Sequence, residues 1–244
     1  MQYSSRGHWF GLVLLCFHEH SLTLRQLGPN RALLEISREH LDFHSHPIVR
    51  LAIATDFLSL VLSMNPLVLI LPGFWNSGPQ HWQTQWEAGH PEWKRVLQRD
   101  WQTPDRAEWV ETLRLNVAAC RRPPILVAHS LGCALVAHWA QAANRGTIAG
   151  AFLVAPSDVD APSYPSGTTG FTPMPMHRLH FPSLLVASRN DPYCSVARAA
   201  AFSSAWGSDI AWVGEAGHIN ADTGFGPWPD GERMLLDFCA HVQG

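Results

Sequence analysis

Apolar residues in the second part of the chain form short continuous runs, and amphipathic stretches separate these runs. The continuous runs predict buried strands of a parallel sheet at residues 67–71, 96–98, 124–128, 149–154, 184–187 and 210–213. Apolar positions at helical spacing predict helices at residues 80–88, 107–119, 134–143, 196–206 and 232–242. We therefore expect a three-layer α/β fold in which helices cover both faces of a mostly parallel sheet of about six strands.

A different pattern covers residues 156–182, which contain six prolines and two glycines. This density of prolines is incompatible with a long helix. We expect a long ordered loop, and loops of this length commonly border a binding site.

The first 63 residues lack the alternation of strands and helices. They contain six of the fourteen histidines but only one of the eleven tryptophans. The apolar run at residues 9–17 has no cleavage site of small residues after it, and the run at 48–63 includes two charged residues. Neither run has the pattern of a signal peptide or a membrane span. We interpret residues 1–63 as an N-terminal extension that is poorly ordered or spurious, and residues 64–244 as the folded domain.

Composition narrows the classes of function. A hydrophobic content of 46% excludes disorder throughout, and a net charge of −3 provides no strongly basic face for nucleic acid. The five cysteines have no metal-type spacing, and we interpret them as reduced thiols of a cytoplasmic protein. We expect no metal and no cofactor, no nucleic-acid or membrane partner, and a monomer or small homo-oligomer.

The motif that carries most chemical information is Ala128-His129-Ser130-Leu131-Gly132, which stands between a predicted strand and an apolar helix. This strand, turn and helix are the context that a nucleophile elbow requires. Small residues two positions before and two positions after the serine leave room where neighbouring strands crowd the turn. The alternative is that Ser130 is an ordinary helix N-cap. The apolar segments on both sides favour a nucleophile.

A serine hydroxyl is a weak nucleophile without a base. In this type of fold the acid and the histidine follow the serine in the chain, each at the end of a later strand. Asp191 comes shortly after the run at 184–187, and His218 lies in a glycine-flanked loop after the run at 210–213. We therefore predict that Ser130, Asp191 and His218 form a catalytic triad.

Other residues compete for two of these roles. Asp158 and Asp160 follow the strand predicted at 149–154 and are alternatives for the acid. The competing histidines are His81, His129, His138, His177 and His180. Because His129 is inside the elbow, we expect its side chain to point away from the site.

Acyl transfer also needs hydrogen-bond donors for a developing oxyanion. The backbone N–H of Leu131, directly after the serine, is one candidate. The second donor should come from the loop at residues 72–78, which follows the first strand of the domain. We predict the N–H of Phe74, with Trp75 as the alternative.

At these residues the chain resembles the small α/β-hydrolase serine hydrolases of the retinoblastoma-binding protein 9 and YdeN type. The resemblance covers roughly residues 66–241. It rests on Leu71-Pro72-Gly73, Asn76-Ser77-Gly78-Pro79, His81-Trp82-Gln83, Ala128-His129-Ser130-Leu131-Gly132, Val154-Ala155-Pro156-Ser157-Asp158-Val159-Asp160, Ser188-Arg189-Asn190-Asp191-Pro192 and Gly217-His218-Ile219-Asn220. The resemblance implies an α/β-hydrolase fold without a large cap domain and the same Ser130–Asp191–His218 triad. It does not imply one substrate.

These observations predict a cofactor-independent serine hydrolase that cleaves small carboxylic esters through an acyl-enzyme on Ser130. A small peptide or amide is the second candidate substrate. A protein-binding module on a hydrolase scaffold, with little turnover, is the alternative from a different class, and it would bring in a protein partner.

The translation start is the first testable prediction. Met64 stands two residues before the region of resemblance, and sixteen of the seventeen basic residues are arginine, which is typical of GC-rich coding sequences. Such reading frames often extend upstream without a stop codon, so we expect translation to begin at Met64. Mass spectrometry of N-terminal peptides from the natural protein should identify that start. Abundant peptides from residues 10–60 would contradict it.

Overall fold

Two units make up the chain, residues 1–61 and residues 62–244. The structure, a computed structural model, describes residues 13–17, 20–28, 31–36 and 66–243. In the first unit, β2 (His20–Gly28) pairs antiparallel with β1 (Val13–Phe17) and with β3 (Arg31–Ile36). The lack of alternation between strands and helices in residues 1–63 is compatible with these strands, because antiparallel strands need no helix between them. The rest of the predicted N-terminal extension lies outside the described residues.

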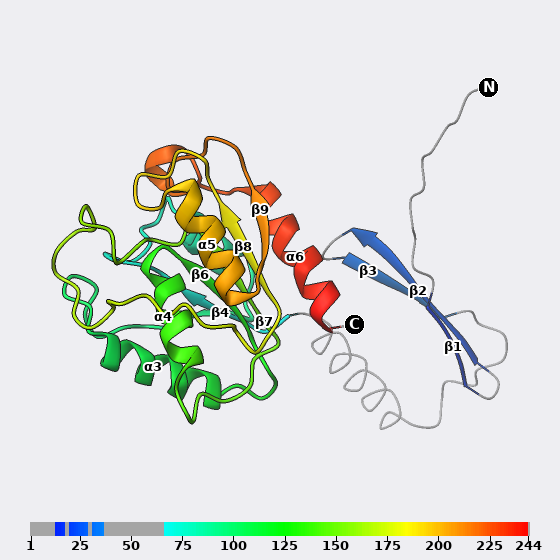
Figure 1. The fold of residues 1–244 in the computed structure, drawn as a ribbon. Coiled ribbons are helices and arrows are strands. Elements are labelled where there is room, and N and C mark those ends of the chain that lie inside the picture. Colours follow the sequence, from blue (N-terminus) through cyan, green and yellow to red (C-terminus); the bar gives the residue numbers. More distant parts are fainter. Residues whose placement is uncertain (1–12, 18–19, 29–30, 37–65, 244) are drawn as a thin grey trace. The chain divides into compact units, whose positions relative to one another are not determined.

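A six-stranded sheet forms the centre of the second unit (Figure 1). Its strands are β4 (Val68–Leu71), β5 (Trp93–Arg95), β6 (Ile125–His129), β7 (Gly150–Val154), β8 (Ser183–Ala187) and β9 (Asp209–Trp212). They lie in the order β5-β4-β6-β7-β8-β9, and every neighbouring pair is parallel. The predicted six-stranded parallel sheet is thereby confirmed.

One predicted strand is wrong in its position. The structure has no strand at residues 96–98; β5 comes earlier and pairs with the first three residues of β4. Within β5, Trp93 is buried while Lys94 is exposed, because β5 is at the edge of the sheet. Such an edge strand lacks the continuous apolar run of a strand that is buried on both faces.

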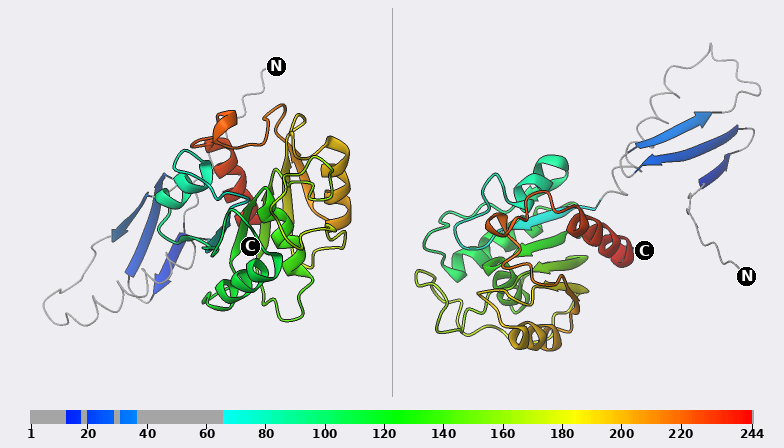
Figure 2. Two further views of the ribbon diagram at one scale, coloured as in Figure 1. Left: turned by 90° about the vertical axis from the view of Figure 1, so that its left-hand side faces the viewer. Right: turned by 90° about the horizontal axis from the view of Figure 1, so that it is seen from above.

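Helices cover the two faces of the sheet (Figure 2). They are α2 (Trp82–Gly89), α3 (Arg106–Ala118), α4 (Leu131–Ala140), α5 (Val196–Trp206) and α6 (Pro229–Gln243), and a short 3₁₀ helix, η1, spans Ala221–Thr223. Side chains of α3, α4 and α5 share one core with the sheet, and those of α2 and α6 share the other. This arrangement confirms the predicted three-layer α/β-hydrolase fold.

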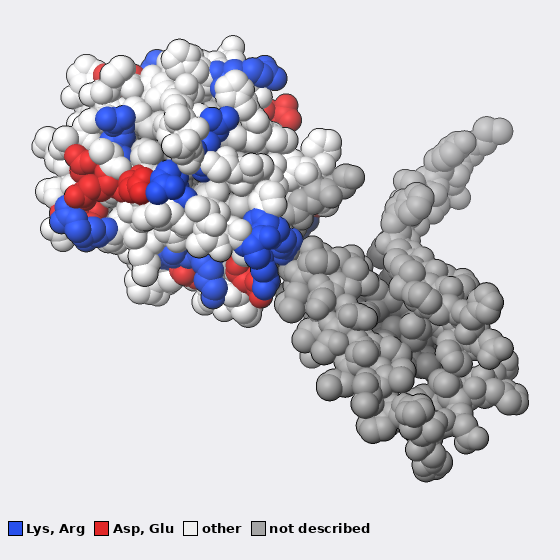
Figure 3. Space-filling view, turned by 90° about the horizontal axis from the view of Figure 1, so that it is seen from below, with Lys and Arg blue, Asp and Glu red and all other residues white. Residues whose placement is uncertain are grey.

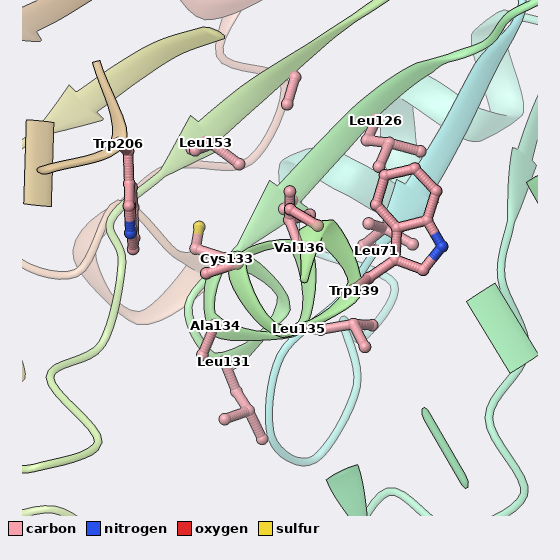
Figure 4. Close-up of a cluster of buried hydrophobic side chains, with 14 of the residues drawn as sticks. Leu71, Leu126, Leu131, Cys133, Ala134, Leu135, Val136, Trp139, Leu153 and Trp206 are labelled. Atoms are coloured by element: carbon pink, nitrogen blue, oxygen red, sulfur yellow. The ribbon is translucent and has the colours of Figure 1, made fainter. Parts of the chain in front are cut away.

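The two cores are separated by the alternation of side chains along each strand. In β6, Leu126 belongs to the core under α3, α4 and α5, whereas Val127 belongs to the core under α2 and α6. The central helix α4 has nine buried residues out of ten. In Figure 4, Cys133 and Val136 point toward the strands, and Leu135 lies on the opposite side of the helix. A helix that is buried all round has little freedom to shift, so α4 holds its first residue in a fixed place.

The proline-rich segment between β7 and β8 is the predicted long loop. Residues 155–182 contain no helix and no strand, so no cap domain is inserted at this point of the described chain. Hydrogen bonds fix the loop: Trp206 Nε1 donates to the Pro175 carbonyl at 2.8 Å, and His138 Nε2 donates to the Phe171 carbonyl at 2.8 Å. Buried side chains, among them Phe171, anchor it further.

The surface of the described domain carries charges of both signs. Acidic and basic side chains stand beside one another on the face shown in Figure 3. Several form ion pairs, among them Arg99 with Glu108 and Arg114 with Glu111. Within the described part of the chain, none of the helices combines the length and the apolar character needed to cross a bilayer.

A substitution at Gly132 tests how closely α4 packs against the sheet. A Cβ at Gly132 would meet the carbonyl oxygen of Leu71, whereas a Cβ at Gly89, in α2, would meet nothing. Gly132→Ala should therefore lower the free energy of unfolding by about 1–3 kcal/mol. Gly89→Ala should leave it unchanged or raise it by up to about 1 kcal/mol. Urea unfolding measures both, and equal stability of the two variants would contradict the packing described.

Candidate active site

The turn between β6 and α4 holds Ser130 in a strained conformation. Its backbone has φ 57° and ψ −123°, a region that side-chain-bearing residues rarely adopt. The turn is fixed because Ser130 N–H donates to the Val154 carbonyl at 3.1 Å, and Cys133 N–H donates to the Ser130 carbonyl at 3.0 Å. The Ser130 hydroxyl makes no capping hydrogen bond to α4. The geometry therefore does not fit the alternative of an ordinary N-cap.

The loop after β4 lies directly against this turn. A Cβ at Gly73 would stand 2.7 Å from Ser130 Cβ and 3.0 Å from Leu131 N, so only glycine permits this approach. Buried Gln83 ties the loop to the sheet. Its Nε2 donates to the Leu71 and Val127 carbonyls at 3.2 Å each, and its Oε1 accepts from the Ser77 hydroxyl at 2.7 Å.

Arg95 fixes the same loop from the other side, a role that its sequence position does not reveal. Trp75 and Asn76 have positive φ values of 63° and 65°. The Arg95 guanidinium, which is only 8% exposed, donates from Nη1 to Asn76 Oδ1 at 2.7 Å and to the Ser77 carbonyl at 2.9 Å. Its Nε pairs with Glu87 at 3.0 Å. This buried cation holds the strained turn in one conformation.

The structure brings Ser130, His218 and Asp191 together from the ends of three strands. His218 Nε2 lies 2.9 Å from Ser130 Oγ, and His218 Nδ1 lies 2.9 Å from both oxygens of Asp191. The side chains of His218 and Asp191 are 7% and 2% exposed. A carboxylate can only accept, so Nδ1 carries the ring proton and Nε2 accepts from the Ser130 hydroxyl. This is the arrangement in which an imidazole can act as a general base.

The competing acids are engaged elsewhere. Asp158 accepts from Nε and Nη2 of Arg198 at 2.8 Å each. Asp160 accepts from the N–H of Met174 at 3.1 Å and also pairs with Arg198. Neither aspartate contacts His218, so of the three candidates only Asp191 is joined to the histidine.

Two of the competing histidines, His129 and His81, lie near His218, and the side chain of neither one hydrogen-bonds to Ser130. The His129 ring lies 4.9 Å from the His218 ring, and its Nε2 donates to the His218 carbonyl at 2.9 Å. The expectation that His129 points away from the site is therefore wrong: its ring supports the loop that carries His218. The His81 ring lies 4.7 Å from that of His129, and its Nδ1 accepts from the Gln83 N–H, which caps α2.

Burial keeps both supporting rings neutral. It lowers the pKa of His81 to about 3, and the nearby charges of Arg95 and His218 act in the same direction. Burial also holds the pKa of His129 well below its usual value, with smaller contributions from His81 and His218. At neutral pH neither ring adds a positive charge beside His218.

Two backbone N–H groups next to Ser130 are free to donate. Among the hydrogen bonds of residues 66–243, none is donated by the N–H of Phe74 or of Leu131. The N–H of Trp75 donates to the Trp101 carbonyl at 2.9 Å and is occupied. Of the two candidates in the loop, Phe74 is therefore the one that could bind an oxyanion.

A cavity of about 350 Å³ opens above Ser130 and His218. Four aromatic side chains line it: Phe74, Trp75, Tyr164 and Tyr193. The rings of Phe74 and Trp75 are stacked, with centroids 4.1 Å apart. Asp222 is the one acidic residue in the lining, and no lysine or arginine of the described chain contributes to it. This volume is at the small end of the range for ligand sites, which favours a small substrate.

Ser157 and Tyr164 also line this cavity, and no sequence motif identifies either of them as a site residue. Ser157 Oγ lies 2.9 Å from Ser130 Oγ. Both residues come from the proline-rich loop, whose density of prolines predicts a loop at a binding site but not which of its side chains reaches the site.

The second unit of the chain is similar to known proteins. Residues 68–237 match the family model described as serine hydrolase. A protein described as a YdeN-like hydrolase from Pectobacterium atrosepticum has a similar structure, with 36% sequence identity and a TM-score of 0.66, over 78% of this chain and 98% of that chain. No curated protein matched the sequence.

Two further solved structures share the fold. The ydeN gene product of B. subtilis is 20% identical with a TM-score of 0.58, over 72% of this chain and all 100% of its own. Esterase 2 of Thermogutta terrifontis is 13% identical with a TM-score of 0.52, over 73% of this chain and 84% of its own.

The buried neutral His81 predicts a dependence of stability on pH. Between its usual pKa of 6.5 and its folded pKa of about 3, the unfolded chain binds a proton that the folded protein does not. The contribution of His81 to the free energy of unfolding is therefore fully present above pH 6.5. It falls as the pH drops toward 3, by up to about 1.4 kcal/mol per pH unit. His81→Asn keeps a capping oxygen for α2 but cannot titrate. As the pH falls from 6.5, the free energy of unfolding of His81→Asn should decrease less steeply than that of the wild type.

Urea unfolding at pH 6.5 and 4.5 measures this difference. His177→Asn, which replaces an exposed histidine, is the matched control and should lose stability as steeply as the wild type. If His81→Asn loses stability as steeply as His177→Asn, His81 does not have the electrostatic role described.

Proposed function

Since the chain belongs to the serine hydrolase family, we propose that it cleaves small carboxylic esters through a covalent acyl-enzyme on Ser130. The observation that carries this proposal is the continuous path of hydrogen bonds from Asp191 through His218 to Ser130, which ends at the cavity. Acyl transfer requires an acid that orients a base, and a nucleophile that the base can deprotonate within reach of the substrate.

Acylation begins when Ser130 Oγ attacks the carbonyl carbon of the ester. His218 Nε2 takes the hydroxyl proton as the new C–O bond forms, and the carbonyl π electrons move to the oxygen. Asp191 accepts from Nδ1 and stabilises the imidazolium. The N–H groups of Leu131 and Phe74 donate to the oxyanion. When the intermediate collapses, His218 returns its proton to the departing alcohol.

Deacylation repeats these steps with water. His218 removes a proton from a water molecule that attacks the acyl carbon, and the same two N–H groups bind the second oxyanion. Collapse of the second intermediate releases the carboxylic acid, and His218 returns the proton to Ser130. The ester and one water molecule are consumed, and the alcohol, the carboxylic acid and the free enzyme result, so the reaction balances.

The cavity supports a small and uncharged acyl group. A volume of about 350 Å³ is at the small end of the range for ligand sites, which favours a small ester. The aromatic walls favour apolar groups, and Asp222 repels an anionic acyl group for which the lining offers no cation. A short aliphatic or aromatic ester fits these conditions.

The test combines a fluorophosphonate probe with a panel of p-nitrophenyl esters and aminoacyl amides. The wild type should be labelled and should cleave short-chain esters. Ser130→Ala should not be labelled, and its kcat/KM should fall by about 10⁴-fold or more. Ser204→Ala, an exposed position on α5, is the matched control and should behave as the wild type.

Three outcomes would contradict the proposal. Ester turnover by Ser130→Ala at the wild-type rate would remove Ser130 as the nucleophile. A labelled wild type that cleaves only amides would replace the ester by an amide substrate. A folded wild type that is neither labelled nor active would favour a binding module on a hydrolase scaffold.

A further inference from the structure

We propose that Ser157 is a catalytic residue of this site: its hydroxyl donates to Ser130 Oγ and directs the single proton of the nucleophile toward His218. The inference rests on the proposed function of Ser130 as the nucleophile. It adds a fourth member to the path of hydrogen bonds, beyond the triad and the two oxyanion donors.

The position of Ser157 is built by the backbone around it. Its side chain is buried, lines the cavity, and places Oγ 2.9 Å from Ser130 Oγ. The preceding turn contains Ala155, which has a positive φ of 46° and whose N–H donates to the Val186 carbonyl at 2.8 Å. The N–H of Asp158, the next residue, donates to the Tyr193 carbonyl at 2.8 Å. Hydrogen bonds on both sides therefore fix the residue.

The direction of the Ser157 hydrogen bond follows from counting protons along the path. Asp191 accepts only, so the proton of the neutral His218 ring is on Nδ1 and Nε2 must accept. The only proton of the Ser130 hydroxyl therefore lies between Oγ and Nε2. Nothing is left on Ser130 to donate to Ser157, so Ser157 is the donor in the 2.9 Å contact between the two hydroxyls.

This direction matters for the chemistry. A hydroxyl oxygen has two lone pairs. On Ser130 one pair accepts from Ser157, which leaves the other to attack the substrate. As His218 removes the proton, negative charge grows on Ser130 Oγ, and a hydrogen bond to a charged oxygen is stronger than one to a neutral hydroxyl. Ser157 keeps its own proton throughout.

The same interaction acts in both halves of the reaction. In acylation Ser130 Oγ gains charge before the C–O bond is complete, and in deacylation it gains charge again as that bond breaks. In the acyl-enzyme the oxygen is part of an ester and is a poorer acceptor. Ser157 therefore stabilises each transition state more than the state that precedes it, which is the neutral hydroxyl in acylation and the acyl-enzyme in deacylation, and both barriers are lowered.

The test measures the acylation burst and the steady-state deacylation of a p-nitrophenyl ester, together with the rate of fluorophosphonate labelling. In Ser157→Ala both rates and the labelling rate should fall about tenfold, the effect of one hydrogen bond of ordinary strength. KM should stay unchanged, because acylation and deacylation slow by the same factor. Ser157→Cys, with a weaker donor of similar size, should lie between Ser157→Ala and the wild type.

Ser203→Ala is the matched control. Ser203 lies on α5, and its buried hydroxyl also makes one hydrogen bond, which it donates to the Ser208 carbonyl at 2.8 Å. Ser203→Ala should lower stability in urea and leave all three rates unchanged. If Ser157→Ala does not fold, the Ser157→Cys variant decides by the same rates.

The outcomes separate this inference from the proposed function. A wild type that is labelled and active, with Ser157→Ala at the same rates, overturns the role of Ser157 and leaves the function of Ser130 intact. A loss in acylation alone also overturns it, because it would assign Ser157 to the first leaving group. A wild type without labelling or turnover overturns the proposed function itself.

Discussion

The strained turn at Ser130 is the constraint on which the rest of the site depends. A side-chain-bearing residue at φ 57° costs about 1–3 kcal/mol, and the turn persists because buried segments on both sides leave it no alternative. Behind it, nine of the ten residues of α4 are buried. Gly73, in the loop after β4, and Gly132, in α4, permit contacts that no larger side chain would allow. Ser130 therefore stands at the end of β6, in the lining of the cavity, with free N–H groups beside it.

The topology of the sheet brings the other participants to the same edge. In a parallel sheet every strand ends on one side, and ligands bind beside those ends. Phe74 follows β4, Ser157 follows β7, Asp191 follows β8 and His218 follows β9. Each loop is then fixed by contacts that have no chemical role of their own, such as the hydrogen bond of His129 to the loop of His218. The parallel sheet brings the loops together, and these contacts hold each loop in place.

Sequence reasoning predicts the parts of this structure that have a local signal. Apolar strand ends followed by Ser130, Asp191 and His218 identify the candidate triad, and the family match confirms the resemblance to YdeN-type hydrolases. The position of the edge strand β5 is predicted wrongly, because its charged residues interrupt the apolar run that marks a buried strand. The contact of Ser157 with Ser130 joins residues 27 positions apart through two loops, and no spacing rule predicts it. The role of Arg95 is equally non-local.

If Ser130 is the nucleophile, its hydroxyl becomes covalently acylated during turnover. An acid quench of the protein within the burst of a p-nitrophenyl ester, followed by peptide mass spectrometry, detects this acyl-enzyme. We expect one added acyl group, on the peptide that contains Ser130 and on that residue. Ester turnover with no acylated peptide, or with the acyl group on the neighbouring Ser157, would contradict it.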